Sequence, residues 1–133
     1  MKTLVYKLYT GGVTVNGHGS VYGGWLFDVL DKSSLVWINE NITSKIGGVA
    51  AATSSATVKF HHVVMPNGFV EAYAECSDIS AGNITIDVEL YYRKNDSTDA
   101  ELAVSGTLAF SLIDKDTRKL KRIPREIIDA NKG

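Results

Sequence analysis

The order of hydrophobic and polar positions predicts one strand followed by one long helix. Apolar residues alternate over residues 4–9, which indicates a strand whose two faces are both at least partly covered. From about Tyr22 the period changes to three and four residues, which is typical of a helical face. The residues on this face are Trp25, Leu26, Val29, Leu30, Ser33, Val36 and Trp37. The helix is predicted to fade between Asn39 and Thr43 and to end by Gly47-Gly48.

The rest of the chain is predicted to be almost entirely strand. Residues 49–64 form a long strand-like segment, and Pro66-Asn67-Gly68 marks the turn that follows it. Three further strands, separated by polar turns, are predicted over residues 69–76, 84–92 and 102–113. A short helical turn is expected after Pro124.

These elements predict an α+β fold. Consecutive strands joined by tight turns pair antiparallel, and one helix cannot cover both faces of the resulting sheet. We therefore expect a curved antiparallel sheet wrapped around one long central helix. Apolar residues on both faces of the last strand predict that the chain forms a homo-oligomer. A length of 133 residues suits one domain and is short for two, so residues 1–133 are predicted to form a single domain.

Composition narrows the function classes. A formal net charge of −1 argues against nucleic acid as a main partner, because such proteins need a basic face. No apolar run reaches the ~18 residues of a membrane span, and the alternating N-terminus does not have the apolar core of a signal peptide. Cys76 is the one cysteine, so no internal disulfide can form and a reducing compartment is expected. We therefore expect a cytoplasmic protein without a membrane partner.

The stretch from Asn16 to Asp31, NGHGSVYGGWLFDVLD, holds the strongest candidate chemistry. Its glycine-rich loop leads through Gly23-Gly24 into the predicted helix. Glycines let a ligand approach the backbone closely, and a helix beginning here would aim unpaired N–H groups and its positive dipole end at that ligand. Asp31 lies about two turns later, some ~10 Å along the helix axis. The N–H donors and the acid of one subunit are thus too far apart to act on one carbon atom.

The pattern Asn16-x-x-Gly19-x-x-Tyr22-Gly23-Gly24-Trp25, followed by Asp31, resembles the signature of the hotdog-fold acyl-CoA thioesterases. The closest group is the YciA-like and cytosolic acyl-CoA hydrolase branch. The resemblance covers about residues 4–126 and includes Val58-x-Phe60, the alternating strand 84–92 and the ending Arg122-Ile123-Pro124-Arg125-Glu126.

Two departures from the family pattern are visible. The segment Phe60-His61-His62-Val63 lacks the proline usual shortly after the phenylalanine, and Asn67-Gly68 replaces the usual Gly-Asp turn. The linker between the helix and the second strand is also longer than usual. These departures leave the fold expectation intact and leave the acyl-chain preference and the coenzyme A groove open.

The resemblance implies a hydrolase that converts an acyl-CoA to free coenzyme A and a carboxylic acid. Coenzyme A would be part of the substrate, with no separate cofactor and no metal. In the family, the asparagine loop and helix N-terminus of one subunit face the acid of the other, in a dimer or in a tetramer or hexamer of dimers. This implies Asp31 as general base or nucleophile, Asn16 as the residue that orients the thioester or the water, and Gly24 as the oxyanion donor. Substrate-binding roles are expected for Tyr22, Gly23, His18, Phe60, Arg122 and Arg125.

Each of these residues also has a structural alternative. Asn16 could be a turn residue in a left-handed conformation. Gly23-Gly24 could serve only close packing between helix and sheet. Asp31 could cap a backbone group or pair with Lys32. Asp28, one turn earlier, is a rival acid, although it does not occupy the matching position.

The remaining histidines, the cysteine and a basic cluster complete the candidate residues. His61 and His62 are adjacent, so on a strand they point to opposite faces and cannot both ligate one ion. Cys76 lies on the inward set of its strand and predicts a buried structural thiol. The basic cluster is either a solvated tail or a site for coenzyme A phosphates, which arginine side chains suit. It contains Arg118, Lys119, Lys121, Arg122 and Arg125.

Two other functions remain open on the sequence. One is a non-catalytic hotdog protein that binds acyl-CoA. The other is a hotdog dehydratase of hydroxyacyl thioesters, which would use a histidine such as His18 with an acid across the dimer. The sequence determines neither the length of the acyl chain nor whether the thiol carrier is coenzyme A or acyl-carrier protein.

Overall fold

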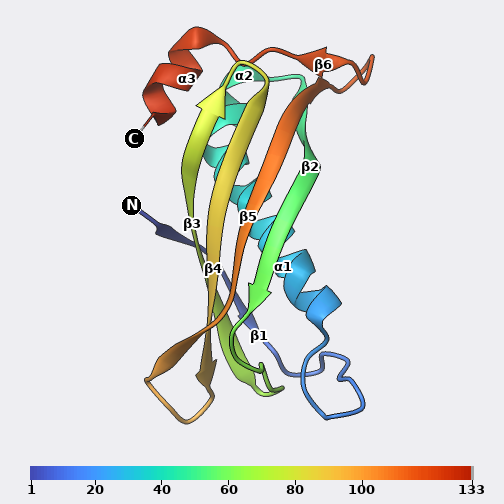
Figure 1. The fold of residues 1–133 in the computed structure, drawn as a ribbon, viewed down its shortest axis with the longest axis vertical. Helices are drawn as coiled ribbons and strands as arrows, with labels where there is room; N and C mark the ends of the chain where they lie inside the picture. Colours follow the sequence, from blue (N-terminus) through green and yellow to red (C-terminus); the bar gives the residue numbers. More distant parts are fainter. Residues whose placement is uncertain (133) are drawn as a thin grey trace.

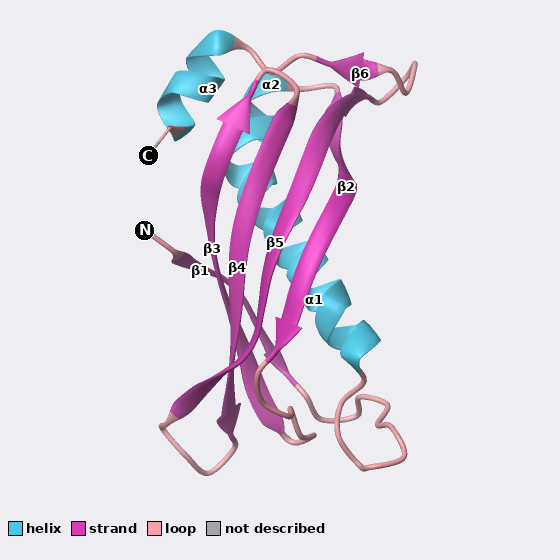
Figure 2. Cartoon of the chain, in the orientation of Figure 1, coloured by secondary structure: helices cyan, strands magenta, loops and turns pink. Residues whose placement is uncertain are grey.

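A computed structural model describes residues 1–132 and contains a curved antiparallel sheet wrapped around one long helix (Figures 1 and 2). The elements in chain order are β1 (Thr3–Tyr9), α1 (Gly23–Ile38), the π-helical turn η1 (Asn39–Thr43), α2 (Ser44–Ile46), β2 (Val49–Phe60), β3 (Gly68–Ser80), β4 (Asn83–Lys94), β5 (Ala100–Asp114), β6 (Leu120–Lys121) and α3 (Arg125–Asn131). The strand order is β1-β3-β4-β5-β2, with β6 paired to one end of β5. The predicted curved antiparallel sheet around one long helix is confirmed. The expected pairing of consecutive strands is wrong for β2 and β3, because β2 pairs with β5 instead.

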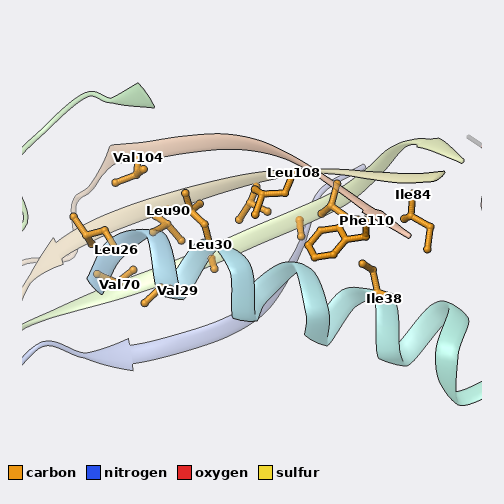
Figure 3. Packing of buried hydrophobic residues seen from close by; sticks show 14 of the residues in the cluster. Leu26, Val29, Leu30, Ile38, Val70, Ile84, Leu90, Val104, Leu108 and Phe110 are labelled. Atoms are coloured by element: carbon orange, nitrogen blue, oxygen red, sulfur yellow. The ribbon is translucent and has the colours of Figure 1, made fainter. Parts of the chain in front are cut away.

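The hydrophobic core lies between α1 and the concave face of the sheet (Figure 3). Alternation puts every second residue of β4 on this face, and five of the six are buried: Ile84, Ile86, Val88, Leu90 and Tyr92. The sixth, Lys94 at the end of the strand, is exposed. From the helix, Leu26, Val29, Leu30, Ser33, Ser34 and Ile38 are buried against them. Trp25, Val36 and Trp37 of the predicted face are only half-buried, because the buried stripe follows Ile38 instead.

Helix and sheet pack closely at Gly106 of β5. A Cβ atom at this position would lie 3.1 Å from Cδ1 of Leu30, which is tighter than most real contacts. The buried hydroxyls of Ser33 and Ser34 donate to the carbonyls of Val29 and Leu30 at 2.6 and 2.9 Å, so the helix satisfies its own buried polar groups. This close packing fixes the position of α1, and therefore of Asp31, on the sheet.

The helical segment continues through the region where it is predicted to fade and ends by Gly47-Gly48, as predicted. Residues 39–43 form a π-helical turn, and α2 carries the helix on to Ile46. Two contacts explain the continuation: Ile42 is fully buried, and Nδ2 of Asn41 donates to the carbonyl of Trp37 at 2.9 Å. Gly47 then ends the helix with φ 80° and ψ 147°, a conformation that only glycine adopts readily.

The second strand is shorter than predicted, because β2 ends at Phe60. The N–H groups of His61 and His62 both donate to the carbonyl of Ala103, at 2.7 and 3.1 Å, so the backbone leaves the ladder there. Val64, predicted as part of the strand, lies in the following loop, where its carbonyl accepts a bond from the N–H of Val21 at 2.8 Å.

Cys76 is half-buried rather than fully buried. A register shift between Cys76 and Asp78 turns its side chain partly out of the core, and Sγ lies 3.3 Å from the carbonyl oxygen of Asp78. Burial nevertheless raises the pKa of this thiol above its ordinary value, so a structural role is still favoured over a nucleophilic one. No helix within residues 1–132 is both long enough and apolar enough to cross a membrane.

Candidate active site

Helix α1 begins without a capping side chain. Tyr22 occupies the N-cap position, its side chain makes no capping bond, and the first turn contains no acidic residue. The first backbone bond of the helix runs from the N–H of Leu26 to the carbonyl of Tyr22 at 3.2 Å. The N–H groups before it have no partner inside the helix, as is general for a first turn. Gly23 and Gly24 are both exposed here, so these donors and the positive dipole end are accessible.

Gly24 has no structural reason to be glycine within the subunit. A Cβ atom at this position would meet no atom within 4 Å, and its φ angle is not positive. A Cβ atom at Gly23 would lie 3.4 Å from Cζ of Phe60, an ordinary contact. Close packing between helix and sheet therefore does not explain the pair, although glycine in a helix is less favourable than alanine by roughly 0.5–1 kcal/mol.

Asn16 organises the loop in front of the helix. Its Oδ1 accepts from the N–H of His18 at 2.9 Å and of Ser20 at 3.2 Å, while Nδ2 donates to Oγ of Ser20 at 2.9 Å. Gly19 turns the loop with φ 80°. These bonds agree with a turn role, although Asn16 does not take the left-handed conformation expected for it. They leave one of the two Nδ2 hydrogens for another acceptor. His18 is exposed on the same loop.

Asp31 is half-buried on the helix and is held by the sheet. Its Oδ1 accepts a bond of 2.7 Å from Oγ1 of Thr53, which lies on β2 at a register shift between Thr53 and Ser55. Lys32 forms its ion pair with Asp28 instead, at 2.8 Å and with both side chains exposed. The rival acid is thus engaged at the surface, and Asp31 is the carboxylate that faces the strand.

Thr53 is a candidate site residue that the sequence pattern does not reveal. It stands in a run of small and hydroxyl residues on β2, and neither its position nor the neighbouring register shift follows from that run. A bulge can re-aim a side chain, which is why only the structure connects Thr53 to Asp31.

The helix N-terminus and Asp31 are separate parts of one subunit. The helix is continuous from Gly23 to Ile38, so Asp31 lies ~10 Å along the axis from Gly24. The helix N-terminus lies beside Phe60 at one end of β2, while Asp31 contacts Thr53 in the first half of this strand. One subunit therefore presents the donors and the acid at two different places.

A cavity of about 260 Å³ lies beside the helix N-terminus. Its lining is Ser20, Val21, Gly23, Leu26, Phe60, His61, His62, Val63 and Val64. Phe60 and Val63 are largely exposed, whereas Val21, Leu26 and Val64 are buried. The cavity thus has an apolar floor and an apolar mouth next to free backbone donors, a combination that suits an acyl group joined to a carbonyl.

The two adjacent histidines bond to different residues of β5. Nε2 of His61 lies 2.7 Å from Oγ of Ser105, and Nε2 of His62 lies 2.7 Å from Oε2 of Glu101. They do not converge on one point, in agreement with a polar strand end.

The basic cluster lies around β6 and the start of α3, at the end of the molecule opposite the helix N-terminus (Figure 1). Its side chains are exposed. Arg125 is 3.8 Å from Asp129, and among the ion pairs of residues 1–132 none involves Arg122. Within one subunit, therefore, Arg122 and Arg125 do not approach the cavity at the helix N-terminus.

Comparison with solved structures shows the hotdog fold. A hexameric hotdog fold thioesterase of Campylobacter jejuni, Cj0915, superposes with a TM-score of 0.84 at 18% identity, covering 96% of this chain and 95% of that one. HI0827, a hexameric broad-specificity acyl-coenzyme A thioesterase, gives a TM-score of 0.83 at 18% identity, covering 98% of this chain and 89% of that one.

Sequence comparison identifies the family. An uncharacterised acyl-CoA thioester hydrolase of Zymomonas mobilis is 27% identical over 103 residues, which are 77% of this chain and 66% of that protein. The matched segment thus spans slightly less than two thirds of the relative's length. The profile of the thioesterase superfamily matches residues 18–98, more than half of the chain and including both Gly24 and Asp31. The chain belongs to the thioesterase superfamily.

Proposed function

We propose that this protein is an acyl-CoA thioesterase that hydrolyses an acyl-CoA to free coenzyme A and a carboxylic acid, without a metal or a separate cofactor. The observation that carries the proposal is the uncapped helix start at Gly24, where the fold itself does not require a glycine. A half-buried acid on the same helix, Asp31, supplies the second group that the reaction needs. The Zymomonas relative is named for the same reaction.

The chemistry assigns one role to each group. The carboxylate of Asp31 takes a proton from a water molecule, and the water oxygen bonds to the thioester carbon; direct attack by the carboxylate is the alternative. The N–H of Gly24 donates to the oxyanion that forms, and the C–S bond then breaks to release the coenzyme A thiolate, which is protonated. A general base contributes about 10²–10⁴-fold, and one oxyanion donor about 10²–10³-fold.

Two copies of the chain are needed to build one site. Since Gly24 and Asp31 of one copy are ~10 Å apart along the helix, the donors of one copy act with the acid of the other. Each dimer then has two sites, with Asn16 to Gly24 from one copy and Asp31 from its partner. The hexameric state named for HI0827 and Cj0915 supports assembly of this kind.

Strand β2 offers the edge for this pairing. It is the last strand in the sheet order, it is twelve residues long, and Lys59 is its only charged residue. Residues 53–57 are all exposed. Long edge strands without charges or proline pair readily with another strand, and natural monomers avoid them. A second copy running antiparallel would satisfy the free backbone groups of this edge.

The contacts inside one subunit predict the register of the pairing. Asp31 lies beside Thr53, and Gly23 lies beside Phe60. For the helix start of one copy to meet the acid of the other, Thr53 must lie opposite Phe60 across the new edge. Thr57 is then the midpoint, because Thr53, Thr57 and Phe60 pair with the evenly spaced residues Phe110, Thr107 and Val104 of β5. The two-fold axis should pass close to Thr57.

The basic cluster fits the same assembly. An antiparallel pair brings the β6 end of one copy to the side on which the other copy has its helix N-terminus. Arg122 and Arg125 would hold the phosphates of coenzyme A there, since guanidinium groups bind phosphate oxygens in pairs of hydrogen bonds. The proposed substrate is therefore charged at one end and apolar at the other.

Complementation between two inactive variants tests the shared site. Asp31→Asn and Gly24→Ala should each lose most release of free thiol from butyryl-CoA while keeping the fold, as judged by circular dichroism. Co-expressed, they should regain about a quarter of the wild-type activity, because half of the dimers are mixed and each mixed dimer has one intact site. Full activity of Asp31→Asn alone would show that the carboxylate of Asp31 has no catalytic role. Saturable acyl-CoA binding by an inactive wild type would favour the non-catalytic binding protein.

Cross-linking tests the register separately. In a Cys76→Ser background, the cysteine of Thr57→Cys in one subunit should form a disulfide with the same cysteine in the other subunit. Thr53→Cys should link only when mixed with Phe60→Cys, and Thr107→Cys on β5 serves as the negative control. Self-linking at Thr53 would contradict the proposed axis.

A further inference from the structure

The ring of Phe60 lies beside the N-terminus of helix α1. Its Cζ and Cε1 atoms lie 3.4 and 3.6 Å from the position that a Cβ atom of Gly23 would take. The side chain is nevertheless 57% exposed, more than any other phenylalanine in residues 1–132. An apolar ring in this state covers the approach to the helix start and gains little from burial in the core of its own subunit.

The backbone around Phe60 is well held. Phe60 is the last residue of β2, where it pairs with Val104, and the next two N–H groups donate to the carbonyl of Ala103. On the other side of the cavity, the bond from Val21 to Val64 ties the following loop to the start of the helix. The ring is thus mounted on a fixed strand end at the mouth of the 260 Å³ cavity.

The position of the Phe60 ring concerns the carbon atom of the acyl chain that is bonded to the thioester carbonyl. An oxyanion bound to the N–H of Gly24 lies about 2.9 Å from that nitrogen, and the carbonyl carbon follows about 1.2 Å farther on. The first carbon of the acyl chain is therefore the next atom to find a place beside the helix start. The Phe60 ring already flanks that space, because it lies 3.4 Å from the position that a Cβ atom of Gly23 would take.

We propose that Phe60 is the specificity-determining residue for the shape of the acyl group, and that it admits acyl chains with an unbranched carbon next to the carbonyl while excluding branched or aromatic ones. This rests on the proposed thioesterase function. A CH₂ group leaves room beside the ring, whereas an extra methyl group or an aryl ring at the same carbon overlaps it. One methylene-sized difference in a pocket changes kcat/KM by about 10–200-fold, which is the range to be expected here.

A panel of butyryl-CoA, isobutyryl-CoA and benzoyl-CoA tests the selection. In Phe60→Ala, the ratio of kcat/KM for isobutyryl-CoA or benzoyl-CoA to that for butyryl-CoA should rise about 10-fold or more over wild type. The same ratio for Phe60→Leu should lie between the ratios of wild type and Phe60→Ala. Met65→Ala is the matched control, since Met65 is an exposed apolar residue of the neighbouring loop that does not line the cavity. Its ratios should equal those of wild type.

The outcomes separate this inference from the function on which it rests. If wild type hydrolyses the panel and Phe60→Ala lowers or preserves all three rates by the same factor, the selective role is wrong and the thioesterase stands. If wild type hydrolyses none of the three at a rate above Asp31→Asn, the thioesterase proposal itself fails. Unfolding temperatures of Phe60→Ala and Phe60→Leu close to that of wild type establish that a changed ratio is not a loss of folded protein.

Discussion

Two glycine pairs lie at the two ends of the same helix, and the fold explains only one of them. At the C-terminal end, Gly47 and Gly48 have φ angles of 80° and 68°, which other residues adopt only with strain. At the N-terminal end, Gly24 has neither a positive φ nor a neighbour that a side chain would touch. The first pair stops the helix. The N-terminal pair leaves the N–H donors of the helix open to a group outside the subunit.

The residues around the two ends of the helix differ as the two glycine pairs do. Beyond Gly48, the backbone is closed by its own bonds: the N–H of Lys115 donates to Gly48, and Asp114 caps the turn before β6. At Gly23 and Gly24 no side chain caps the helix, and exposed apolar groups such as Phe60 and Val63 gather beside it. An uncapped helix end among exposed apolar side chains indicates binding rather than folding.

The largest expected effect is that of Gly24→Ala on catalysis. The methyl group should lower kcat/KM for butyryl-CoA by about 10²-fold, since a misplacement of about 1 Å at a reacting centre has a consequence of that size. The free energy of unfolding should stay the same or rise, because alanine favours a helix over glycine by roughly 0.5–1 kcal/mol. Urea titration and thiol release measure the two effects. Full activity would mean that this glycine does not face the substrate.

Gly47→Ala should show the opposite behaviour. A side chain at φ 80° and ψ 147° is strained by about 1–3 kcal/mol, so the free energy of unfolding should fall by this amount. The turnover per folded molecule should not change. Gly82→Ala is the control, because Gly82 lies in an open turn without a positive φ. Equal stability of Gly47→Ala and Gly82→Ala would contradict the assignment of the C-terminal pair to folding.

Thr53→Val is expected to have a smaller effect on catalysis. The change keeps the shape but removes the hydroxyl that donates to Asp31 at 2.7 Å. A hydrogen bond to a charged group contributes about 1.5–3 kcal/mol, and partial replacement by water should leave a loss of about 10-fold in kcat. Thr53→Ser restores the donor and should recover most of the rate. Equal rates for the valine and serine variants would show that Thr53 does not position the acid.

The smallest effect concerns the turn before β6. Backbone N–H groups of Thr117 and Asp116 donate to Asp114 and hold its pKa below the ordinary value. The bonds therefore stabilise the fold above about pH 3.9, the ordinary value of an aspartate in an unfolded chain, and this stability is lost as the pH falls through the lower folded pKa. Wild type should lose more stability than Asp114→Asn between about pH 5 and pH 2 in acid unfolding followed by circular dichroism. An equal loss would contradict the capping role.

Alternation was sufficient to predict the strands, because each face of the sheet has one environment. The inward residues of β4 from Ile84 to Tyr92 are all buried, and short turns correctly predict the pairing of β3 with β4 and of β4 with β5. The pairing of β2 with β5, which are far apart in the chain, does not follow from the turns. The continuation of the helix through residues 39–43 and the end of β2 were predicted less well. Single tertiary contacts decided both: the burial of Ile42 extends the helix, and the two bonds to Ala103 stop the strand at Phe60.

Only part of the candidate site could be predicted from the sequence. The helix start and its acid follow from a local pattern, since both lie on one helix. Thr53 and the closeness of Phe60 to Gly23 depend on how β2 crosses that helix, and a local pattern does not contain this information. The roles of Asn16, Asp31 and Gly24 in catalysis stay predictions.

The π-helical turn at residues 39–43 gives the chain a place to change its length. Such a turn holds one residue more than an α-helical turn, whereas an extra residue within a regular helix rotates all that follows by about 100°. Here the added residue lies between Asp31 and the fixed stop at Gly47. Loss of one residue from this turn would leave a regular helix with both ends in place, so Asp31 would still face Thr53. Related chains with a shorter connection to β2 can thus keep the same acid in the same orientation.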